Sequence, residues 1–221
     1  QYLTLNRSEI FFADKIILIE GDTERILLPA MLKKLDQEYN FDIPLLSQNI
    51  SIIEVGNYSE IYSRFINFIN TKTLIITDID SNKYEDVKDK DGKPKKNKDG
   101  SIKQKAEPCP VSDGTFTSNS ALKFYLKGKL NESSENDIET LTKLTLSDKT
   151  VKYSEEKNPS TGEIKRQWVS DPNGNVLIAY QASESNTEGV EYNARSFEDA
   201  FFHINRKLFT DLSGNNKTEK I

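Results

Sequence analysis

The sequence has very few of the residues that cross-link secreted proteins or hold zinc. Its 221 residues include one cysteine, Cys109, one histidine, His203, and one tryptophan, Trp168. A single cysteine cannot form an internal disulfide, and no group of zinc-binding cysteines exists. A disulfide-stabilised extracellular domain is therefore excluded, and we expect a protein of the reducing cytoplasm.

Long apolar runs are absent as well. No stretch approaches the roughly 20 apolar residues that a membrane helix needs, so we expect no membrane partner. The chain opens at Gln1 without the basic, hydrophobic and small-residue segments of a secretory signal. Because the chain starts without Met and within a stretch of periodically spaced apolar residues, we interpret it as part of a longer protein.

Two further absences concern nucleotides and nucleic acids. No G-x-x-x-x-G-K-[ST] phosphate loop occurs, so we expect no ATP site. Positive charge is not in excess, since 30 lysines and arginines stand against 35 acidic residues, a net charge of −5. That balance argues against a surface that binds nucleic acid over its whole extent. Between Lys83 and Lys105, however, nine lysines face five acids, which permits a DNA partner without requiring one.

The first third of the chain alternates between strand and helix patterns. Continuous apolar runs predict buried strands at Lys15–Glu20, Ile50–Val55 and Thr73–Asp80. Helical periodicity follows the first two runs, at 22–35 and 58–69. This alternation predicts an α/β fold with a parallel sheet, whose functional groups gather outside the carboxyl ends of its strands.

The helical pattern of residues 58–69 predicts one buried face. The apolar side chains expected on that face are Ile61, Phe65, Phe68 and Ile69. A last helix beginning at Ser196 is expected to be continuous through residue 209. Its expected buried face consists of Phe197, Phe201, Ile204 and Leu208.

The middle of the chain is more polar. Residues 81–113 are rich in lysine, contain the near-duplicates K-D-K-D-G-K and K-N-K-D-G-S, and predict a loop or hairpin. Strands are predicted at Val151–Tyr153, Arg166–Ser170 and Asn175–Gln181. The D-P-N-G turn at 171–174 predicts that the last two form a hairpin.

Four acidic residues are predicted near the carboxyl edge of the sheet. Glu20 ends the first predicted strand, and Glu24 lies one turn into the next helix. Asp78 and Asp80 end the third strand, and two residues apart on an extended strand they point to the same side. If the first and third strands are neighbours, the four carboxylates converge. Oxygen ligands of this kind select Mg²⁺, Mn²⁺ or Ca²⁺ over zinc.

A third acidic pair, Glu198 and Asp199, has a structural alternative. Asp199 lies three residues after Ser196, where a carboxylate caps a helix, so capping and metal binding stay equally open. Glu24 has the same alternative, because acids are favoured in the first turn of any helix. For Asp78 and Asp80 the metal interpretation is preferred, since acids that end a buried strand are costly without a partner.

Several phrases together resemble one known family. Residues 7–29, R-S-E-I-F-F-A-D-K-I-I-L-I-E-G-D-T-E-R-I-L-L-P, resemble the segment that opens the Toprim domain of OLD-family ATP-dependent endonucleases, the group that includes the Gabija defence nuclease. Further similar phrases follow in the family's order: I-E-V-G-N at 53–57, T-D-I-D at 77–80, T-S-N-S-A-L-K at 117–123, A-Y-Q at 179–181 and Y-N-A-R-S-F-E-D-A-F at 192–201.

The resemblance implies a Toprim fold, a Rossmann-like parallel sheet of about four strands between helices, with a two-metal site for Mg²⁺ or Mn²⁺, or Ca²⁺. It implies a DNA endonuclease or nickase that acts in antiphage defence. The implied metal ligands, directly or through water, are Glu20, Glu24, Asp78, Asp80, Glu198 and Asp199, of which the first four would be catalytic. Gly21, Gly56 and Thr77 would support the site, and Lys123 and Arg195 are candidates for DNA phosphate contacts.

The resemblance also implies domain boundaries. Residues 1–12 would connect to a preceding ATPase domain, 13–210 would be the Toprim domain with insertions at 81–113 and 150–181, and 211–221 would be a polar tail. The ATPase domain is thus an expected partner, and a homo-oligomer is compatible with the family. An essential lysine of the family, in a run resembling K-S-x-F-A, has no counterpart before Ile221, and Lys217 and Lys220 are poor substitutes. We therefore expect this chain alone to bind metal but to cut DNA poorly.

Other interpretations stay open. Topoisomerase or primase chemistry is disfavoured, because no tyrosine has supporting context and zinc-binding cysteines are lacking. A non-catalytic oligomerisation or regulatory module would retain the same fold. Trp168 is interpreted as a packing residue and His203 as a surface residue, and Arg195 has the alternative of pairing with an acid. The lysine-rich run is interpreted as a solvated loop, with DNA contact as the less favoured alternative.

Overall fold

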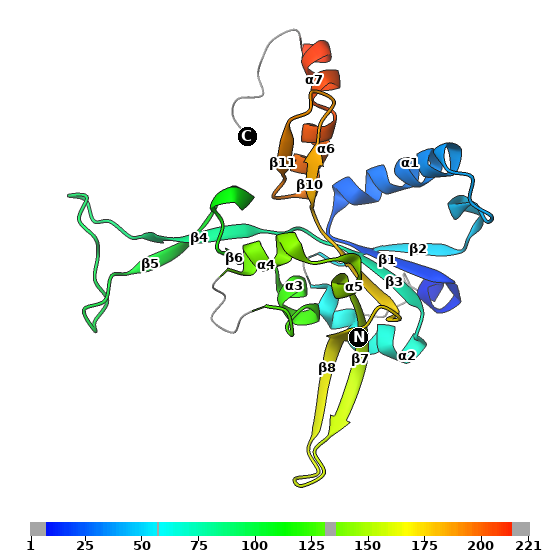
Figure 1. Cartoon of the computed structure of the whole chain (residues 1–221), viewed down its shortest axis with the longest axis horizontal. Helices are drawn as coiled ribbons and strands as arrows, with labels where there is room; N and C mark the ends of the chain where they lie inside the picture. The colour runs from blue at the N-terminus through cyan, green and yellow to red at the C-terminus, as the bar shows by residue number, and fades with distance from the viewer. Residues whose placement is uncertain (1–7, 57, 131–135, 214–221) are drawn as a thin grey trace. The chain divides into compact units, whose positions relative to one another are not determined.

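The computed structural model describes residues 8–56, 58–130 and 136–213 (Figure 1). The chain divides into two compact units. The described residues of unit 1 fall within 8–78, 119–129 and 144–180, and those of unit 2 within 79–118, 130–143 and 181–213. Outside the described residues lie residues 1–7 of the expected connector, Asn57, residues 131–135, and residues 214–221 of the expected tail with Lys217 and Lys220.

Unit 1 is built on a six-stranded sheet of order β2-β1-β3-β9-β7-β8 (Figure 1). Its strands are β1 (Lys15–Ile19), β2 (Ile50–Glu54), β3 (Lys72–Ile76), β7 (Thr150–Lys157), β8 (Ile164–Ser170) and β9 (Val176–Ala179). The first four in spatial order are mutually parallel, whereas β7 pairs antiparallel with both β9 and β8. The expected α/β class and four-stranded parallel sheet are confirmed, and the first and third predicted strands are neighbours.

Helices and short 3-10 turns connect these strands. They are η1 (Ser8–Phe12), α1 (Asp22–Glu38), η2 (Leu45–Ser47), η3 (Ser59–Tyr62), α2 (Ser63–Ile69), α3 (Ser120–Tyr125) and α5 (Leu146–Lys149). On one face of the sheet, Ile17 and Ile19 of β1 pack with Leu28 of α1. The alternate residues Ile16 and Leu18 are buried on the other face. The continuous apolar run of β1 thus suits a strand covered on both sides.

The predicted buried face of residues 58–69 is wrong for two of its four residues, whereas Phe65 and Ile69 are partly buried. Ile61 is 68% exposed and Phe68 is 82% exposed, while Ser63 and Ile66 are buried. The segment begins as the 3-10 helix η3 and becomes α-helical only at Ser63. A 3-10 helix has three residues per turn, so it shifts the helical phase from which the face was predicted.

The predicted hairpin between β8 and β9 is also wrong. The turn forms, since the Gly174 N–H donates to the Asp171 carbonyl at 2.8 Å. However, Val151 of β7 is registered with Ser170 of β8 on one side and with Val176 of β9 on the other. The turn therefore connects β8 to β9 across β7, which lies between these two strands in the sheet.

Unit 2 contains two small sheets and short helices (Figure 1). The first sheet has the order β5-β4-β6, and the second pairs β10 with β11, both antiparallel. Its elements are β4 (Ser81–Asp86), β5 (Gln104–Pro108), η4 (Val111–Asp113), β6 (Phe116–Thr117), α4 (Asp137–Lys143), β10 (Ser183–Ser185), β11 (Glu191–Asn193), α6 (Phe197–Ile204) and α7 (Arg206–Ser213). The lysine-rich segment, expected as a loop or hairpin, forms the β4–β5 hairpin.

The last helix is interrupted. Asn205 ends α6, and its side-chain amide donates to the Phe201 carbonyl at 2.8 Å. Ile204 and Leu208, predicted to be buried, are 43% and 57% exposed, so the single buried face predicted for this segment is wrong. The break at Asn205 separates the first half of that face from the second. None of the helices in the described ranges has both the length and the apolar character needed to cross a membrane.

Candidate functional site

The parallel register of unit 1 brings several predicted residues to one edge of the sheet. β1 and β3 align Leu18 with Ile75, so Glu20, just after β1, comes beside Thr77, just after β3. β2 ends next to them, because the Val55 N–H donates to the Ile19 carbonyl at 2.9 Å. Carboxyl ends of parallel strands share one edge, which is where α/β proteins bind ligands.

Glu20 is held in a defined orientation. Its Oε1 accepts hydrogen bonds from the Thr77 hydroxyl, from the Asp78 N–H at 3.1 Å and from the Asn119 side-chain amide at 3.0 Å. Its other oxygen, Oε2, makes no hydrogen bond to any residue that the structure describes. Three donors on one oxygen fix the orientation of the carboxylate, and the second oxygen stays free of hydrogen bonds to described residues.

Asn119 contributes to the site from a distant part of the sequence. Its Oδ1 accepts the Leu122 N–H at 3.1 Å and so caps α3. Its Nδ2 donates to Glu20 and also to the Thr77 hydroxyl oxygen, the latter at 2.8 Å. The sequence analysis did not identify Asn119 as a site residue. The only signal was the family-like phrase T-S-N-S-A-L-K, which contains Asn119.

Glu24 serves the start of α1. It is 3% exposed, and its Oε2 accepts the Gly21 N–H at 3.1 Å. This bond satisfies one of the free donors at a helix start, which supports the capping interpretation. Gly56, the other glycine predicted near the site, follows β2 with a φ of 62°, a left-handed conformation that favours glycine.

The two aspartates after β3 differ from their predicted arrangement. β3 ends at Ile76, so neither Asp78 nor Asp80 lies in the strand. Asp80 has a φ of 46°, which lies in the left-handed region, so strand alternation does not place the two side chains on one side. Asp78 is the last residue of its segment of unit 1, and Asp80 belongs to unit 2.

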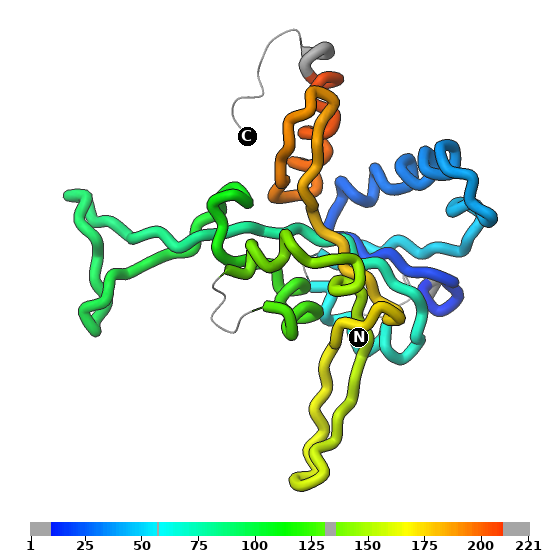
Figure 2. The backbone as a smooth tube through the Cα atoms, in the orientation of Figure 1, coloured from blue at the N-terminus to red at the C-terminus, as the bar shows by residue number. Residues whose placement is uncertain are grey.

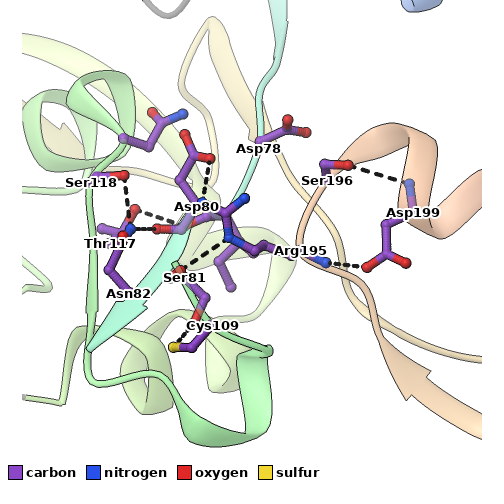
Figure 3. Close-up of polar contacts among 12 residues, drawn as sticks. Asp78, Asp80, Ser81, Asn82, Cys109, Thr117, Ser118, Arg195, Ser196 and Asp199 are labelled. Atoms are coloured by element: carbon purple, nitrogen blue, oxygen red, sulfur yellow. Dashed lines mark hydrogen bonds and ion pairs between the residues drawn. The ribbon is translucent and has the colours of Figure 1, made fainter. Parts of the chain in front are cut away.

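Within unit 2, the backbone around Asp80 is bonded on both sides. The Ile79 N–H donates to the Gln181 side-chain oxygen at 2.8 Å, and the Ile79 carbonyl accepts the Thr117 hydroxyl at 2.7 Å. The Asp80 carbonyl accepts the Asn82 side-chain amide at 2.7 Å (Figure 3). A strained non-glycine conformation persists where the surroundings over-determine it, as these bonds do here.

Arg195 pairs with an acid of its own unit. Its guanidinium lies 3.5 Å from the Asp80 carboxylate, and its Nε donates to the Ser81 carbonyl at 3.1 Å (Figure 3). This is the alternative that the sequence left open for Arg195. Lys123, the other candidate for a phosphate contact, is exposed on α3 of unit 1.

Asp199 is engaged at the start of α6. Its N–H donates to the Ser196 hydroxyl at 3.3 Å, and its Oδ2 accepts the Arg195 N–H and the Tyr192 hydroxyl, both at 2.9 Å. Burial and the bonded Asp199 carboxylate raise the pKa of Tyr192 to about 12. The exposed Glu198 accepts the Ser196 hydroxyl at 3.1 Å. The bonds of Asp199 support its capping interpretation.

In the part of the chain that the structure describes, no group of three or more His, Cys, Asp or Glu side chains is arranged to hold a metal ion. What the structure brings together is Glu20 with the backbone of Asp78, the hydroxyl of Thr77 and the amide of Asn119. We call these four residues the Glu20 site.

Comparisons with known proteins bear on the family to which this chain is similar. Residues 11–80 match the TOPRIM-domain family of overcoming-lysogenization-defect-like proteins, which confirms the family resemblance. The match spans β1, α1, β2 and β3 and includes Glu20, Glu24, Asp78 and Asp80.

One curated relative is similar over most of the chain. Endonuclease GajA of Bacillus cereus (strain HuB5-5) is 29% identical over 206 residues, which are 90% of this chain. The chain spans only 21% of the length of that relative. No solved structure matches.

Proposed function

We propose that this chain is the DNA-cleaving part of an OLD-family nuclease and hydrolyses phosphodiester bonds with the help of divalent metal ions. The observation that carries the proposal is the Glu20 site, a fixed carboxylate at the carboxyl edge of a parallel sheet. The TOPRIM match over residues 11–80 and the similarity to an endonuclease support it.

The residues present suit a hard cation. The side chains proposed to hold metal, Glu20, Glu24 and Asp78, offer only oxygen donors, the type that Mg²⁺ and Mn²⁺ prefer. A divalent ion held by these residues would neutralise charge on a DNA phosphate and lower the pKa of an attacking water. Asp80, Glu198 and Asp199 stay predicted ligands, to be tested one by one.

The chain's own residues would orient the reaction. Thr77 and Asn119 would act as positioning residues, because both hold Glu20 Oε1 and neither carries a charge that competes for the cation. The main chain of Asp78 would hold the Asp78 carboxylate near the same site, since the Asp78 N–H donates a hydrogen bond to Glu20. Outer hydrogen bonds of this kind usually set the orientation of metal-binding groups.

A plasmid-cleavage assay tests the proposal. Because this chain alone is expected to cut DNA poorly, the full-length wild-type protein with Mg²⁺ or Mn²⁺ is compared with its Glu20→Gln and Asp78→Asn variants, which remove one negative charge each with little change in shape. Both variants should lose cleavage by about 100-fold or more, as happens when groups acting on the transition state are removed. The matched control is Asp14→Asn, since Asp14 is exposed in the same unit. Undiminished cleavage by Glu20→Gln would sink the proposal.

Metal binding gives a second measurement that does not depend on activity. Mn²⁺ should raise the melting temperature of the wild-type protein by mass action, as any ligand of the folded state does. The Glu20→Gln, Asp78→Asn double variant should show little or no rise, and Asp14→Asn should behave as wild type. An equal rise in the double variant would place metal binding elsewhere.

We further propose that the whole protein acts in antiphage defence, together with an ATPase domain. The support is the resemblance to the OLD family and to the Gabija group of nucleases. Phage plating on bacteria that carry the wild-type or the Glu20→Gln protein tests this role. Equal plaque numbers with both would contradict it.

A further inference from the structure

The β4–β5 hairpin carries a concentration of positive charge that the Glu20 site does not use. Residues 83–105 contain nine lysines and five acids, a net charge of +4, whereas the whole chain carries −5. The remaining residues together therefore carry −9. In an acidic chain, a local excess of this size marks a surface with a partner of its own.

The hairpin ends in two similar turns (Figure 2). Asp89 accepts the Lys93 N–H through Oδ1 in the first turn, and Asp99 accepts the Ser101 N–H through Oδ1 in the second. Gly92 and Gly100 close them with φ values of 79° and 88°. We call residues 88–103 the forked tip.

Backbone hydrogen bonds join the two turns at one point. Val87 N–H donates to the Lys103 carbonyl at 2.8 Å, Lys95 N–H to the Val87 carbonyl at 2.7 Å, and Lys103 N–H to the Lys95 carbonyl at 2.8 Å. This ring of three bonds fixes where the fork divides. The backbone of the tip is therefore held in a defined conformation, although its side chains are exposed.

Charges at the base of the hairpin are compensated, whereas those of the tip are not. At the base, Lys83 pairs with Glu85 at 3.4 Å, and Lys105 pairs with Glu107. None of the seven lysines of the forked tip makes an ion pair with a residue that the structure describes. Two of the tip's acids are used to build the turns, and hydrogen bonds from Ser101 lower the pKa of Asp99.

The composition of the tip selects one kind of polyanion. Residues 88–103 contain no aromatic side chain on which unpaired bases could stack and no arginine for two-point contacts with base edges. Tyr84, the nearest aromatic residue, is already stacked on Phe116 at 4.4 Å between ring centroids. Flexible lysines without neighbouring aromatic residues or arginines suit the regularly spaced phosphates of a duplex. Such contacts do not depend on the base sequence.

We propose that the forked tip binds the phosphate backbone of double-stranded DNA. The inference rests on the proposed function, because it assigns part of the substrate binding of a DNA-cleaving protein to a segment outside the Glu20 site. It holds independently of metal, since lysines and phosphates attract each other without a cation between them.

The test measures binding of a short fluorescein-labelled duplex by anisotropy, in EDTA, over a range of salt concentrations. The variant Lys88→Gln, Lys93→Gln, Lys96→Gln, Lys98→Gln removes four tip charges. The control removes four exposed lysines elsewhere, Lys33→Gln, Lys72→Gln, Lys152→Gln, Lys165→Gln, with the same change in net charge. Melting temperatures confirm that both variants are folded.

The tip variant should bind about tenfold or more weakly near 0.1 M salt, with a log–log salt slope shallower by up to about 3.6, since each phosphate contact contributes about 0.9. The control should keep the wild-type slope. An unchanged slope in the tip variant, an equal loss in the control, or preferential binding of single-stranded DNA by the wild type would overturn the inference.

The two proposals fail separately. If Glu20→Gln still cleaves DNA while the tip variant loses binding, the proposed catalytic role of the Glu20 site is wrong and DNA binding by the forked tip is supported. If cleavage needs Glu20 while the tip variant binds DNA as the wild type does, the proposed DNA binding by the forked tip is wrong and the catalytic role of the Glu20 site is supported.

Discussion

At the scale of single residues, Asn119 does the most to define the site. One carboxamide caps α3 through its oxygen and holds Glu20 and Thr77 through its nitrogen. The side chain is fully buried, so loss of any of these bonds leaves a buried polar group without its partner. A residue of this kind links the stability of a helix to the orientation of the carboxylate that we propose to bind metal.

Two substitutions separate these roles of Asn119. Asn119→Ala should lower the free energy of unfolding by about 2 kcal/mol, from the lost cap and the lost buried hydrogen bonds. Asn119→Ser keeps a capping oxygen but is too short to hold Glu20, so it should be about 1 kcal/mol more stable than the alanine variant. Both should show a weaker rise of melting temperature with Mn²⁺. Urea unfolding and thermal melts measure these effects, and a normal Mn²⁺ response in Asn119→Ser would contradict the positioning role.

At the scale of elements, the turn between β8 and β9 lies very close to the backbone of β7. A Cβ on Gly174, in the turn between β8 and β9, would lie 2.3 Å from the Val151 carbonyl oxygen of β7. Real atoms do not approach so closely, so any other residue there must move the turn or the strand.

Gly174→Ala should therefore destabilise the protein by about 1–3 kcal/mol, the usual cost of an overpacked site. Gly128→Ala is the control, because a Cβ there meets no atom within 4 Å. Urea unfolding of the two variants makes the comparison. Equal stability of the two would show that the turn adjusts freely.

A second tertiary link joins the segment after α3 to α5. Lys129 donates to Asp148 at 2.6 Å, and Asp148 also accepts the Thr145 N–H at 3.0 Å as part of the α5 cap. Lys129, with the Thr145 hydroxyl and N–H, holds the pKa of Asp148 well below its usual range. A carboxylate with a lowered folded-state pKa stabilises the protein above about pH 4 and stops doing so as the pH falls through that lowered pKa.

Lys129→Met should accordingly lower the melting temperature at pH 7, and the difference from wild type should shrink as the pH falls below about 4. Lys127→Met, at an exposed lysine nearby, serves as the control and should change little at either pH. Melting curves at pH 7 and pH 3 provide the measurement. An equal difference at both pH values would mean that Asp148 does not mediate the effect.

At the scale of the whole molecule, the chain forms two units whose segments alternate along the sequence. Unit 1 contains the wide sheet, in which β1 and β3 are each paired on both sides. Unit 2 contains narrow sheets, and the forked tip has exposed side chains throughout. Local stability follows burial and pairing, so it should differ strongly between these parts.

Hydrogen exchange measured by mass spectrometry should show this difference. Peptides that cover β1 and β3 should exchange slowest, because their backbone donors are bonded and buried on both faces. Peptides within residues 88–103 should exchange orders of magnitude faster. Comparable protection of the two would contradict this and would indicate that the tip is covered in solution.

The sequence by itself determined the first half of unit 1. Apolar runs and helical periodicity located β1, α1, β2 and β3, and their alternation predicted the parallel sheet and its ligand-binding edge. These signals are local, since each depends on neighbours within a turn of helix or a few strand residues. For the same reason the sequence placed Glu20 at the end of a strand, whereas the pairing of β1 with β3 was only a condition of the prediction and came from the structure.

Only the tertiary structure decided the rest. Asn119 reaches Glu20 across 99 positions of sequence, β7 separates β8 from β9, and Asp80 takes a left-handed conformation fixed by bonds from β6 and Gln181. Local propensity does not specify such pairings, because their free energy comes from burial and hydrogen bonds between distant segments. The predicted faces of residues 58–69 and of α6 with α7 were wrong for a different, local reason, because the helical phase is broken within each segment.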